Sequence, residues 1–309
     1  MRDAPGARIS DYLIESELPA RTTEVAYKAT HRVLPRCARV VILHPTFVGA
    51  RPVELQLMRE ACILEALHHA GVPRVYECGV LERRPWVAME HIEGTTIEQA
   101  AAERPIALSE AMAVVRDAAA ILAHAHRRGV VHRSITPKSI MRTPGRGFPI
   151  CITDWSDASI NADHDTSAQP AQSYTRFYRA PELAIDGRAD ARADIYSLGA
   201  VMFEAATLVL PEPVQKFPGV PEPFHHLLAS MLARFPDDRP SAEAVAAEAG
   251  RLVEVFSDGD GQIEEVEVEL VDIANAPAAV PNLGWMPPDH MATLSTQALG
   301  SMRRRRGEP

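Results

Sequence analysis

Short runs that alternate hydrophobic with polar residues fill much of the first 93 residues and predict β-strands. These runs span residues 9–17, 25–30, 38–43, 75–78 and 86–89. Residues 52–68 predict a helix instead, because their apolar side chains recur at helical spacing. Those side chains belong to Leu55, Met58, Cys62, Leu64 and Leu67. The first part of the chain is therefore expected to be a β-rich unit with a single helix.

From Gly94 onward the pattern becomes helical. A long helix is expected to follow Ser109, whose side chain is suited to cap the helix N-terminus, and Gly129 is expected to end it. Its apolar positions are Ala111, Val114, Val115, Ala118, Ile121, Leu122 and Ala125. Residues 194–208 and 241–256 predict two more helices. No internal repeat is visible, so the chain does not have the pattern of a solenoid or a propeller.

These changes of pattern divide the chain into four expected parts: a flexible leader (1–8), the β-rich unit (9–93), the helical unit (94–256) and a flexible tail (257–309). The tail is acidic at first, then contains prolines, and ends near four arginines at 303–306. Its acidic part resembles an EF-hand calcium loop, but Phe256 falls at the first ligand position, so an acidic linker is the preferred interpretation. The arginines suit anionic lipid, an acidic partner, the chain's own acidic segment or plain solvent.

Composition narrows the class of protein. Hydrophobic residues make up 46% and charged residues 24% of the 309 residues, which is typical of soluble globular proteins. The formal net charge of -9 argues against a nucleic-acid partner. No apolar run reaches the roughly 18 residues of a membrane span and no secretory leader opens the chain, so a cytoplasmic location is expected. The four scattered cysteines are expected to be reduced core thiols. They are Cys37, Cys62, Cys78 and Cys151.

Residues 130–141, V-V-H-R-S-I-T-P-K-S-I-M, resemble the catalytic loop of protein kinases, which reads roughly V-H-R-D-I-K-P-x-N-I-M. The frame is intact, but three chemical groups differ. Ser134 stands at the position of the catalytic aspartate, Thr136 at that of the usual lysine, and Ser139 at that of the metal-binding asparagine. His132 and Arg133 are retained as scaffold residues.

The resemblance extends over residues 12–256 and is nearest to the bacterial serine/threonine kinases of the eukaryotic type. Tyr178 and the run R-A-P-E that ends at Glu182 match the end of the activation segment. The resemblance implies an α+β fold of two lobes, a small antiparallel β lobe with one helix and a larger, mainly α-helical lobe. It also implies that Glu182 pairs with Arg239 and that Asp194 anchors the backbone near His132.

The nucleotide site implied by the resemblance is degenerate. The three positions of the phosphate-binding glycines fall on Pro19, Arg21 and Glu24, and Val41 replaces the lysine that contacts the phosphates. Arg39 takes the small position that would touch adenine. The remaining vestigial nucleotide positions are the gatekeeper Met89, the hinge residues Glu90 and His91, and Met141.

Two acidic positions of the site are retained. Glu60 matches the helix glutamate that normally pairs with the missing lysine. Asp154, in Asp-Trp-Ser where Asp-Phe-Gly is expected, is able to hold Mg²⁺, with Ser139 as a weaker second ligand than asparagine. Two carboxylates without a lysine need a counter-ion, so Arg39 is expected to pair with Glu60 or Asp154, or with the nearer Glu24. The alternative is an Arg39 side chain that leaves the cleft for solvent.

These positions favour a pseudokinase, a regulatory or scaffolding module in signalling that binds a protein such as an active kinase or its substrate. Loss of a general base costs about 10²–10⁴-fold in rate, and Ser134 cannot accept the substrate proton. No cofactor is then expected. The alternative is a weakly active ATP-dependent serine/threonine kinase or another nucleotide-dependent transferase, which would use Mg-ATP. The partner, the oligomeric state and phosphorylation of Thr175 are left open.

Overall fold

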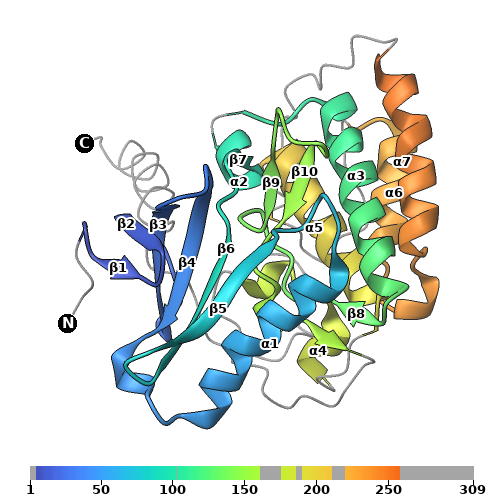
Figure 1. Cartoon of the computed structure of the whole chain (residues 1–309). Helices are drawn as coiled ribbons and strands as arrows, with labels where there is room; N and C mark the ends of the chain where they lie inside the picture. Colours follow the sequence, from blue (N-terminus) through green and yellow to red (C-terminus); the bar gives the residue numbers. More distant parts are fainter. Residues whose placement is uncertain (1–4, 103, 161–174, 186–189, 211–219, 258–309) are drawn as a thin grey trace, which may run out of the picture. The chain divides into compact units, whose positions relative to one another are not determined.

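The strands and the helix expected in the first 93 residues are all present (Figure 1). The computed structural model describes residues 5–102, 104–160, 175–185, 190–210 and 220–257. A six-stranded antiparallel sheet has the order β1-β2-β3-β4-β6-β5. Its strands are β1 (Arg8–Ile9), β2 (Tyr12–Leu18), β3 (Glu24–His31), β4 (Cys37–Leu43), β5 (Val75–Leu81) and β6 (Arg84–Glu90). Helix α1 (Arg51–Leu67) follows β4 after the 3₁₀ turn η1 (Pro45–Phe47).

The sheet begins inside the segment that the sequence assigned to a flexible leader. The Gly6 N–H donates to the carbonyl oxygen of Ile14 at 2.9 Å, and the Ile14 N–H donates to Ala7 at 3.0 Å. Strand β1 then starts at Arg8. Backbone pairing of this kind is not visible as side-chain alternation, because it extends over too few residues to make a pattern.

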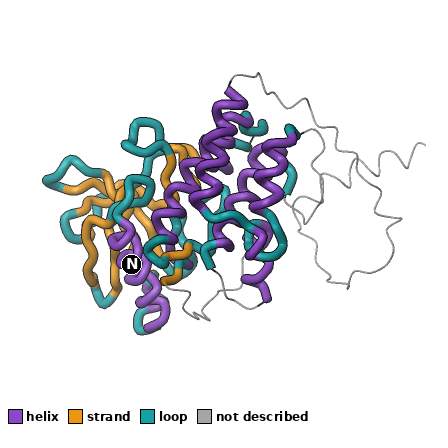
Figure 2. The backbone as a smooth tube through the Cα atoms, turned by 90° about the vertical axis from the view of Figure 1, so that its right-hand side faces the viewer, coloured by secondary structure: helices purple, strands orange, loops and turns teal. Residues whose placement is uncertain are grey.

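The second part of the chain is mainly helical, and Figure 2 shows helices gathered on one side and most strands on the other. Its longer helices are α3 (Leu108–His126), α5 (Arg192–Thr207), α6 (Glu222–Met231) and α7 (Ala242–Ser257), and its shorter ones are α2 (Ile97–Ala100) and α4 (Pro181–Ile185). Short strands complete it: β7 (Thr95–Thr96), β8 (Val130–Val131), β9 (Ile140–Arg142), β10 (Ile150–Ile152) and β11 (Ser159–Ile160). Three 3₁₀ turns are η2 (Trp155–Asp157), η3 (Thr175–Phe177) and η4 (Pro236–Asp238).

The N-terminus of α3 differs from its prediction. The helix begins at Leu108 after Ala107, which makes no side-chain capping bond, so Ser109 is not the cap. The helix gains its stability from its apolar face, which is buried along its whole length, and this burial outweighs the missing cap. The helix ends at His126, and Gly129 then adopts a φ of 72°, a backbone region that favours glycine.

A continuous hydrophobic core joins the two lobes. It includes Val41 and Met89 from the small lobe, Leu64 from α1, Ile121 from α3 and Trp155 from η2. A second cluster lies on the opposite face of the small sheet, around Tyr12, Tyr27 and Trp86. The first cluster sets the distance between α1 and the large lobe, and it therefore positions the site described below.

The cysteines correct one sequence expectation. All four are free, but only Cys151 is buried, while Cys37 is half-buried and Cys62 and Cys78 are exposed. Cys62 lies on the solvent side of α1 and Cys78 on an exposed position of β5, so they are not core thiols. Within the described residues, no helix is long and apolar enough to cross a membrane. The tail features expected after Ser257 lie outside the described residues.

Candidate functional site

Three carboxylates converge on the guanidinium of Arg21. Arg21 lies in the loop between β2 and β3, Glu24 opens β3, and Glu60 lies on α1. Asp154 comes from the large lobe, directly before η2. The Nη2 atom of Arg21 donates a short hydrogen bond to Asp154 Oδ1 and lies 3.8 Å from Glu60 Oε2. Its Nη1 atom lies 3.8 Å from Glu24 Oε1. The structure therefore brings Glu60 of α1 and Asp154 of the large lobe together around a cation, as expected.

The cation is not the expected one. Arg39 was expected to pair with Glu60, Asp154 or Glu24, but its Nη2 atom donates to the carbonyl oxygen of Pro19 at 2.8 Å instead. Arg39 pairs in the sheet with Lys28 and Met89, in the middle of β4, and the β2–β3 loop passes within reach of its side chain. Arg21, at the tip of that loop, is therefore better placed to reach the carboxylates.

Sequence reasoning missed Arg21 because it counted the residue only as a lost glycine. The useful signal was the absence of glycine between Gly6 and Gly49. A hairpin without glycine has a restricted backbone, so an arginine at its tip is held over the cleft and is not free to swing away. The reach of that side chain depends on how far the hairpin bends, which a single sequence does not specify.

The charges of Arg21 and Asp154 stabilise each other. Burial alone would raise the pKa of Asp154, but the Arg21 charge and hydrogen bond hold this pKa below its usual value. Burial likewise opposes the charge of Arg21, but the carboxylate of Asp154, followed by Glu60 and Glu24, raises its pKa. The side chain of Asp154 is 53% exposed, so water and salt still reach this pair. The pair is consequently an ion pair at neutral pH.

Glu60 behaves differently because it is buried. Burial raises its pKa to about 8, and the nearby carboxylates of Asp154 and Glu24 add to that rise, while Arg21 and Arg39 oppose it. Its 3.8 Å separation from Arg21 is too long for a hydrogen bond. Burial also raises the pKa of Glu24. A neutral Glu60 would leave two arginines facing two carboxylates, which balances the charge of the cluster.

Two positions expected on the adenine side of the site are buried. Val41 is 3% exposed and Met89 6% exposed, and both belong to the core cluster that joins the lobes. Arg39 is half-buried, and burial lowers its pKa although the carboxylates of Glu60, Asp154 and Glu24 oppose this effect. Met141 lies on β9 opposite Cys151 and Thr96.

The side chain of Glu90, at the expected hinge, binds neighbouring parts of the chain. Its carboxylate accepts a hydrogen bond from Arg146 at 2.8 Å and another from the backbone N–H of Arg74 at 3.3 Å. Burial lowers the pKa of His91, and Lys28 adds to this effect. The contacts of Glu90 attach the hinge to the loop between β9 and β10.

Ser139 is committed to the backbone of its own loop. Its Oγ accepts from the N–H of Thr136 at 2.9 Å and donates to the Thr136 carbonyl oxygen at 3.0 Å. Both residues are buried. The N–H of Ser134 donates to His132 Nδ1 at 3.3 Å. The hydroxyl of Ser139 therefore closes a turn, which differs from the metal-ligand role considered for it in the sequence.

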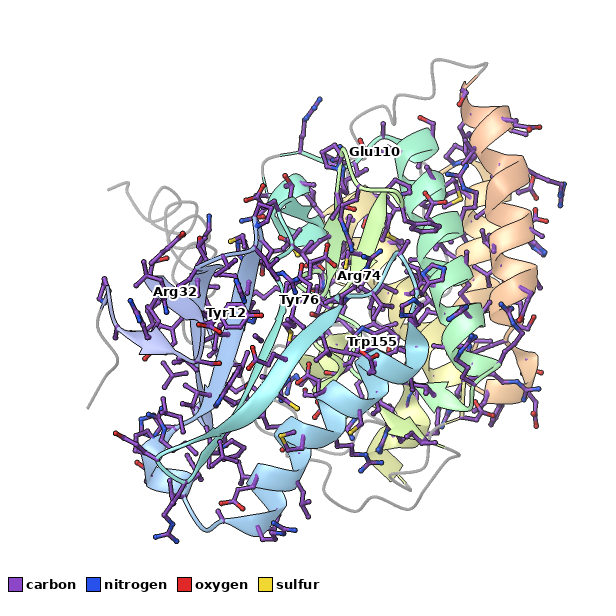
Figure 3. The ribbon with its side chains drawn as sticks, viewed as in Figure 1. Tyr12, Arg32, Arg74, Tyr76, Glu110 and Trp155 are labelled. Atoms are coloured by element: carbon purple, nitrogen blue, oxygen red, sulfur yellow. The ribbon has the colours of Figure 1, made fainter. Side chains whose placement is uncertain are left out.

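The expected anchor of this loop is confirmed. The Oδ2 atom of Asp194 accepts from the backbone N–H of His132 at 2.8 Å, and its Oδ1 atom accepts from Arg133 at 2.7 Å. The ring Nε2 of His126 also lies 2.9 Å from Asp194. Burial alone would raise the pKa of Asp194, but these hydrogen bonds lower it. Figure 3 places the Trp155 ring between α1 and the large lobe, and its centroid lies 4.6 Å from that of His132.

The predicted Glu182–Arg239 ion pair is present. Two guanidinium nitrogens of Arg239 donate to the two carboxylate oxygens of Glu182 at 2.7 and 2.9 Å. Arg239 is 4% exposed and also donates to the carbonyl oxygen of Ala233 at 2.8 Å. A buried guanidinium with this many partners holds α4 against the loop before α7. The parts that shape the large lobe are therefore intact, in contrast to the cleft.

The charged groups of the site are paired with one another. Arg21 makes its hydrogen bond to Asp154, which is the most exposed of the three carboxylates around it. Among the residues that the structure describes, no group of three or more histidines, cysteines and acidic residues is arranged to hold a metal ion. The side chain at the base position, Ser134, has a hydroxyl that remains protonated near neutral pH. The large-lobe carboxylate of this site is therefore paired within the chain.

Comparisons with known proteins agree with this architecture. The family described as "Protein kinase domain" matches residues 48–249, more than half of the chain. The chain is 29% identical over 204 residues to the serine/threonine-protein kinase PknJ of Mycobacterium tuberculosis, a match that covers 65% of this chain and 35% of PknJ. It is 28% identical over 257 residues to PknL of the same species, which covers 77% of this chain and 64% of PknL. The chain thus spans about a third of PknJ and less than two thirds of PknL.

Solved structures give the same fold. The kinase domain of Mycobacterium tuberculosis PknI superposes with a TM-score of 0.63 and 25% sequence identity, covering 80% of this chain and 98% of that domain. The two-lobed kinase-like fold expected from the sequence, with a small antiparallel β lobe and a larger helical lobe, is therefore confirmed.

Proposed function

The chain belongs to the protein kinase family, and from this premise we propose that it is a pseudokinase, a regulatory or scaffolding module that binds a protein partner and does not transfer phosphate. The observation that carries the proposal is the Arg21–Asp154 ion pair, which links the β2–β3 loop to the large lobe. In active kinases the loop lies over the phosphates, and the aspartate binds the metal ion that bridges them. In this chain the two groups neutralise each other.

Mg-ATP, which the family implies, does not fit the residues as they are arranged. The carboxylate of Asp154 is paired with Arg21, and the hydroxyl of Ser139 is used by Thr136. Val41 supplies no charge for a phosphate, and Glu24 would place a carboxylate beside one. The family match starts at residue 48, after the loop and after β4, so the match leaves out the segment where the nucleotide contacts are lost. We therefore derive no catalytic step through this cofactor.

Free-energy estimates support the same proposal. An aspartate base contributes about 10²–10⁴ in rate, and Ser134 cannot replace it. Losing a cation that stabilises the transferring phosphoryl group costs about 3–4 kcal/mol in comparable electrostatic sites. The two losses act on one reaction and are not strictly additive. Either one alone would reduce kinase activity to a low level.

The second candidate is a weakly active ATP-dependent serine/threonine kinase or another nucleotide-dependent transferase. Two observations favour it. The Asp154 side chain keeps about half of its surface open to solvent (53%), and Glu60 still faces the cleft from α1. A ligand that carried both Mg²⁺ and a polyphosphate would offer Asp154 a cation and Arg21 an anion in exchange for their mutual pair.

Two measurements on the full chain separate these candidates. The proposal expects no change in the thermal unfolding temperature with Mg-ATP, and no transfer of labelled phosphate to the chain itself or to a basic protein substrate. A clear stabilisation by Mg-ATP would favour the second candidate, although binding alone does not show turnover. Transfer that is abolished by Asp154→Ala would overturn the pseudokinase proposal.

The partner is proposed to be a protein, either an active kinase or its substrate, bound through the large lobe or the activation segment in the cytoplasm. The intact large-lobe anchors support this, because a surface that binds a partner must be held in one conformation. Affinity capture with the immobilised full chain tests it. A matched capture with a Glu182→Gln/Arg239→Gln variant is expected to lose the partner if the large lobe forms the binding surface. Equal capture by both would place the surface elsewhere.

A further inference from the structure

The β2–β3 loop is attached at two points, one inside the small lobe and one on the large lobe. Arg39, on β4, holds the root of the loop through the carbonyl oxygen of Pro19 at 2.8 Å. Arg21, two residues further along the loop toward β3, reaches the large lobe through its hydrogen bond to Asp154. The backbone N–H of Glu24 returns to the carbonyl oxygen of Arg21 at 3.1 Å and completes the turn. The two arginines therefore have different roles, one intralobe and one interlobe.

The loop is also stiffer than a glycine-rich one. Its sequence from residue 19 to 23 is Pro-Ala-Arg-Thr-Thr, which contains one proline, two β-branched residues and no glycine. Restricting the backbone of the free loop lowers the entropy lost when it is fastened. Forming the contact between Arg21 and Asp154 therefore loses less conformational entropy than the same contact from a flexible loop would lose.

Asp154 is held ready to receive the guanidinium. Its backbone adopts φ 63° and ψ 57°, a left-handed conformation that is uncommon for a non-glycine residue. The following Trp155 is fully buried, and its ring nitrogen donates to the carbonyl oxygen of Ile152 at 2.8 Å. Ser156 Oγ donates to Asp154 Oδ1 at 3.2 Å. These contacts fix the carboxylate on the large lobe independently of the loop.

From these contacts we propose that Arg21 is an interlobe latch: its ion pair with Asp154 fastens the β2–β3 loop to the large lobe and keeps the two lobes closed without a ligand. The proposal concerns closure and not chemistry. It holds whether or not the chain transfers phosphate, so its failure and the failure of the pseudokinase proposal are distinguishable.

Carboxyl groups of both lobes surround the Arg21 guanidinium. Glu60 and Glu24 lie on the small-lobe side of Arg21, at 3.8 Å each, while Asp154 lies on the large-lobe side and makes the hydrogen bond. Arg39 faces the same carboxylates from β4. The small-lobe carboxylates orient the guanidinium, and the hydrogen bond to Asp154 is the connection that crosses between the lobes.

Hydrogen exchange measured on the full chain tests the latch. In Arg21→Gln, the backbone amides of residues 20–24 and 153–157 are expected to exchange on the order of tenfold faster, because each 1.4 kcal/mol lost in closure is a factor of ten. The matched control is Arg32→Gln, which removes an exposed arginine paired with Asp11 at 3.7 Å in the same sheet. Figure 3 shows Arg32 well away from Trp155. The control is expected to leave both segments unchanged, and equal exchange in the two variants would overturn the latch.

A double-substitution cycle identifies the partner of Arg21. Asp154→Asn is expected to speed exchange in residues 20–24, although Asp154 lies in the other lobe. The combined Arg21→Gln/Asp154→Asn variant is expected to exchange no faster than the single variants, because both remove one interaction. Additive effects would mean that the two residues act separately, and the latch would then be rejected.

A measurement on the unmodified chain does not depend on whether a variant folds. The half-exposed pair is screened by salt, so protection of residues 20–24 is expected to fall several-fold between about 0.05 M and about 1 M NaCl. The backbone amides of Val33 and Leu34 in the β3–β4 turn provide the internal reference. They donate to His31 Nδ1, and an amide N–H carries no net charge that salt would screen. Protection of 20–24 that does not respond to salt would overturn the proposal.

Discussion

At the scale of single residues, the site contains a cation although the position expected to carry the family's catalytic lysine is apolar. Val41 makes the lysine position apolar, but Arg21 supplies a positive charge from the neighbouring loop. Asp154 therefore has a hydrogen-bonded partner within the chain, while the Glu60 carboxyl lies 3.8 Å from the same guanidinium. A buried carboxylate without one would cost several kcal/mol or would become protonated.

The raised pKa of Glu60 predicts a pH dependence of stability. Its pKa is about 8 in the folded chain against an ordinary value of 4.5, so the folded state retains a proton that the unfolded state releases. The stability from this proton is complete below about pH 4.5 and is lost as the pH rises through about 8. Each pH unit in this window corresponds to about 1.4 kcal/mol at most.

Glu60→Gln tests this expectation, because glutamine is neutral at every pH. Unfolding by urea between pH 5 and pH 9 is expected to show that the variant gains stability relative to the parent chain as the pH rises. The matched control is Glu65→Gln, at an exposed position about one turn further along α1. The free energy of unfolding of this control is expected to change with pH in the same way as that of the parent chain. Parallel curves for both variants would show that the Glu60 carboxyl is not protonated in this window.

The residue scale also yields a gain-of-binding prediction. Arg21→Gly with Val41→Lys removes the resident cation and places a lysine on the strand face that lines the cleft. This variant is expected to bind Mg-ATP at least tenfold more tightly than the parent, by calorimetric titration, because the lysine and Asp154 become available to phosphate and metal. It is still expected to transfer no phosphate, since Ser134 remains. Binding no tighter than that of the parent would shift the explanation to Arg39 in the adenine space.

At the scale of elements, α4 and the loop before α7 are joined by one buried ion pair. Arg239 forms a two-pronged contact with Glu182 and is packed on the ring of Tyr196 with 4.9 Å between guanidinium carbon and ring centroid. Removing one member leaves the other charge buried. The pair therefore fixes the position of α4 mainly because moving α4 away would leave the buried Arg239 charge without a counter-ion. The net attraction between the two groups contributes less.

This element contact gives a graded stability prediction. Glu182→Gln is expected to destabilise the chain by about 3 kcal/mol, because the Arg239 charge loses its counter-ion inside the protein. Arg192→Gln, which removes an exposed partner of Asp237, is expected to cost less than about 1 kcal/mol. Urea unfolding measures both. Similar losses for the two variants would contradict the view that burial sets the cost.

The elements also show what the sequence is able to predict. Strands β2 to β6 of the six-stranded sheet and helices α1, α3, α5 and α7 follow from side-chain periodicity, since burial of one face imposes that pattern. Ser109 failed as a cap because packing, and not the cap, sets the start of α3. Asp194, Glu182 and Arg239 were located by motif because their partners are backbone groups or a single fixed residue. Arg21 was missed because its position depends on how a loop folds over a cleft.

At the scale of the whole described structure, the two lobes share a core. Trp155, which belongs to the large lobe, is fully buried in the cluster that contains residues of α1 and of the small sheet. Trp86 lies in the separate cluster on the other face of that sheet. The two tryptophans thus report on different parts of the molecule, although both are buried.

This difference predicts unequal effects of one substitution. Trp155→Ala is expected to cost about 3–5 kcal/mol and to reduce hydrogen-exchange protection in α1, α3 and α5 together. Trp86→Ala is expected to have a similar cost but to reduce protection mainly in the small sheet. Exchange measured by mass spectrometry over the whole chain distinguishes them. Loss of protection confined to one lobe in Trp155→Ala would show that the lobes are not stabilised as a unit.

The position of Arg39 has a practical consequence for chemical biology. Compounds that compete with purines need an open, uncharged surface beside the hinge, and here Arg39, which pairs with Met89 in the sheet and donates to Pro19, places a guanidinium next to the hinge. Resins that carry immobilised purine analogues are accordingly expected to leave this chain in the flow-through, and surveys that enrich kinases in this way would undercount proteins of its kind. A selective small molecule would need to be a cation of different shape, one that displaces Arg21 from its carboxylates and leaves the adenine space untouched.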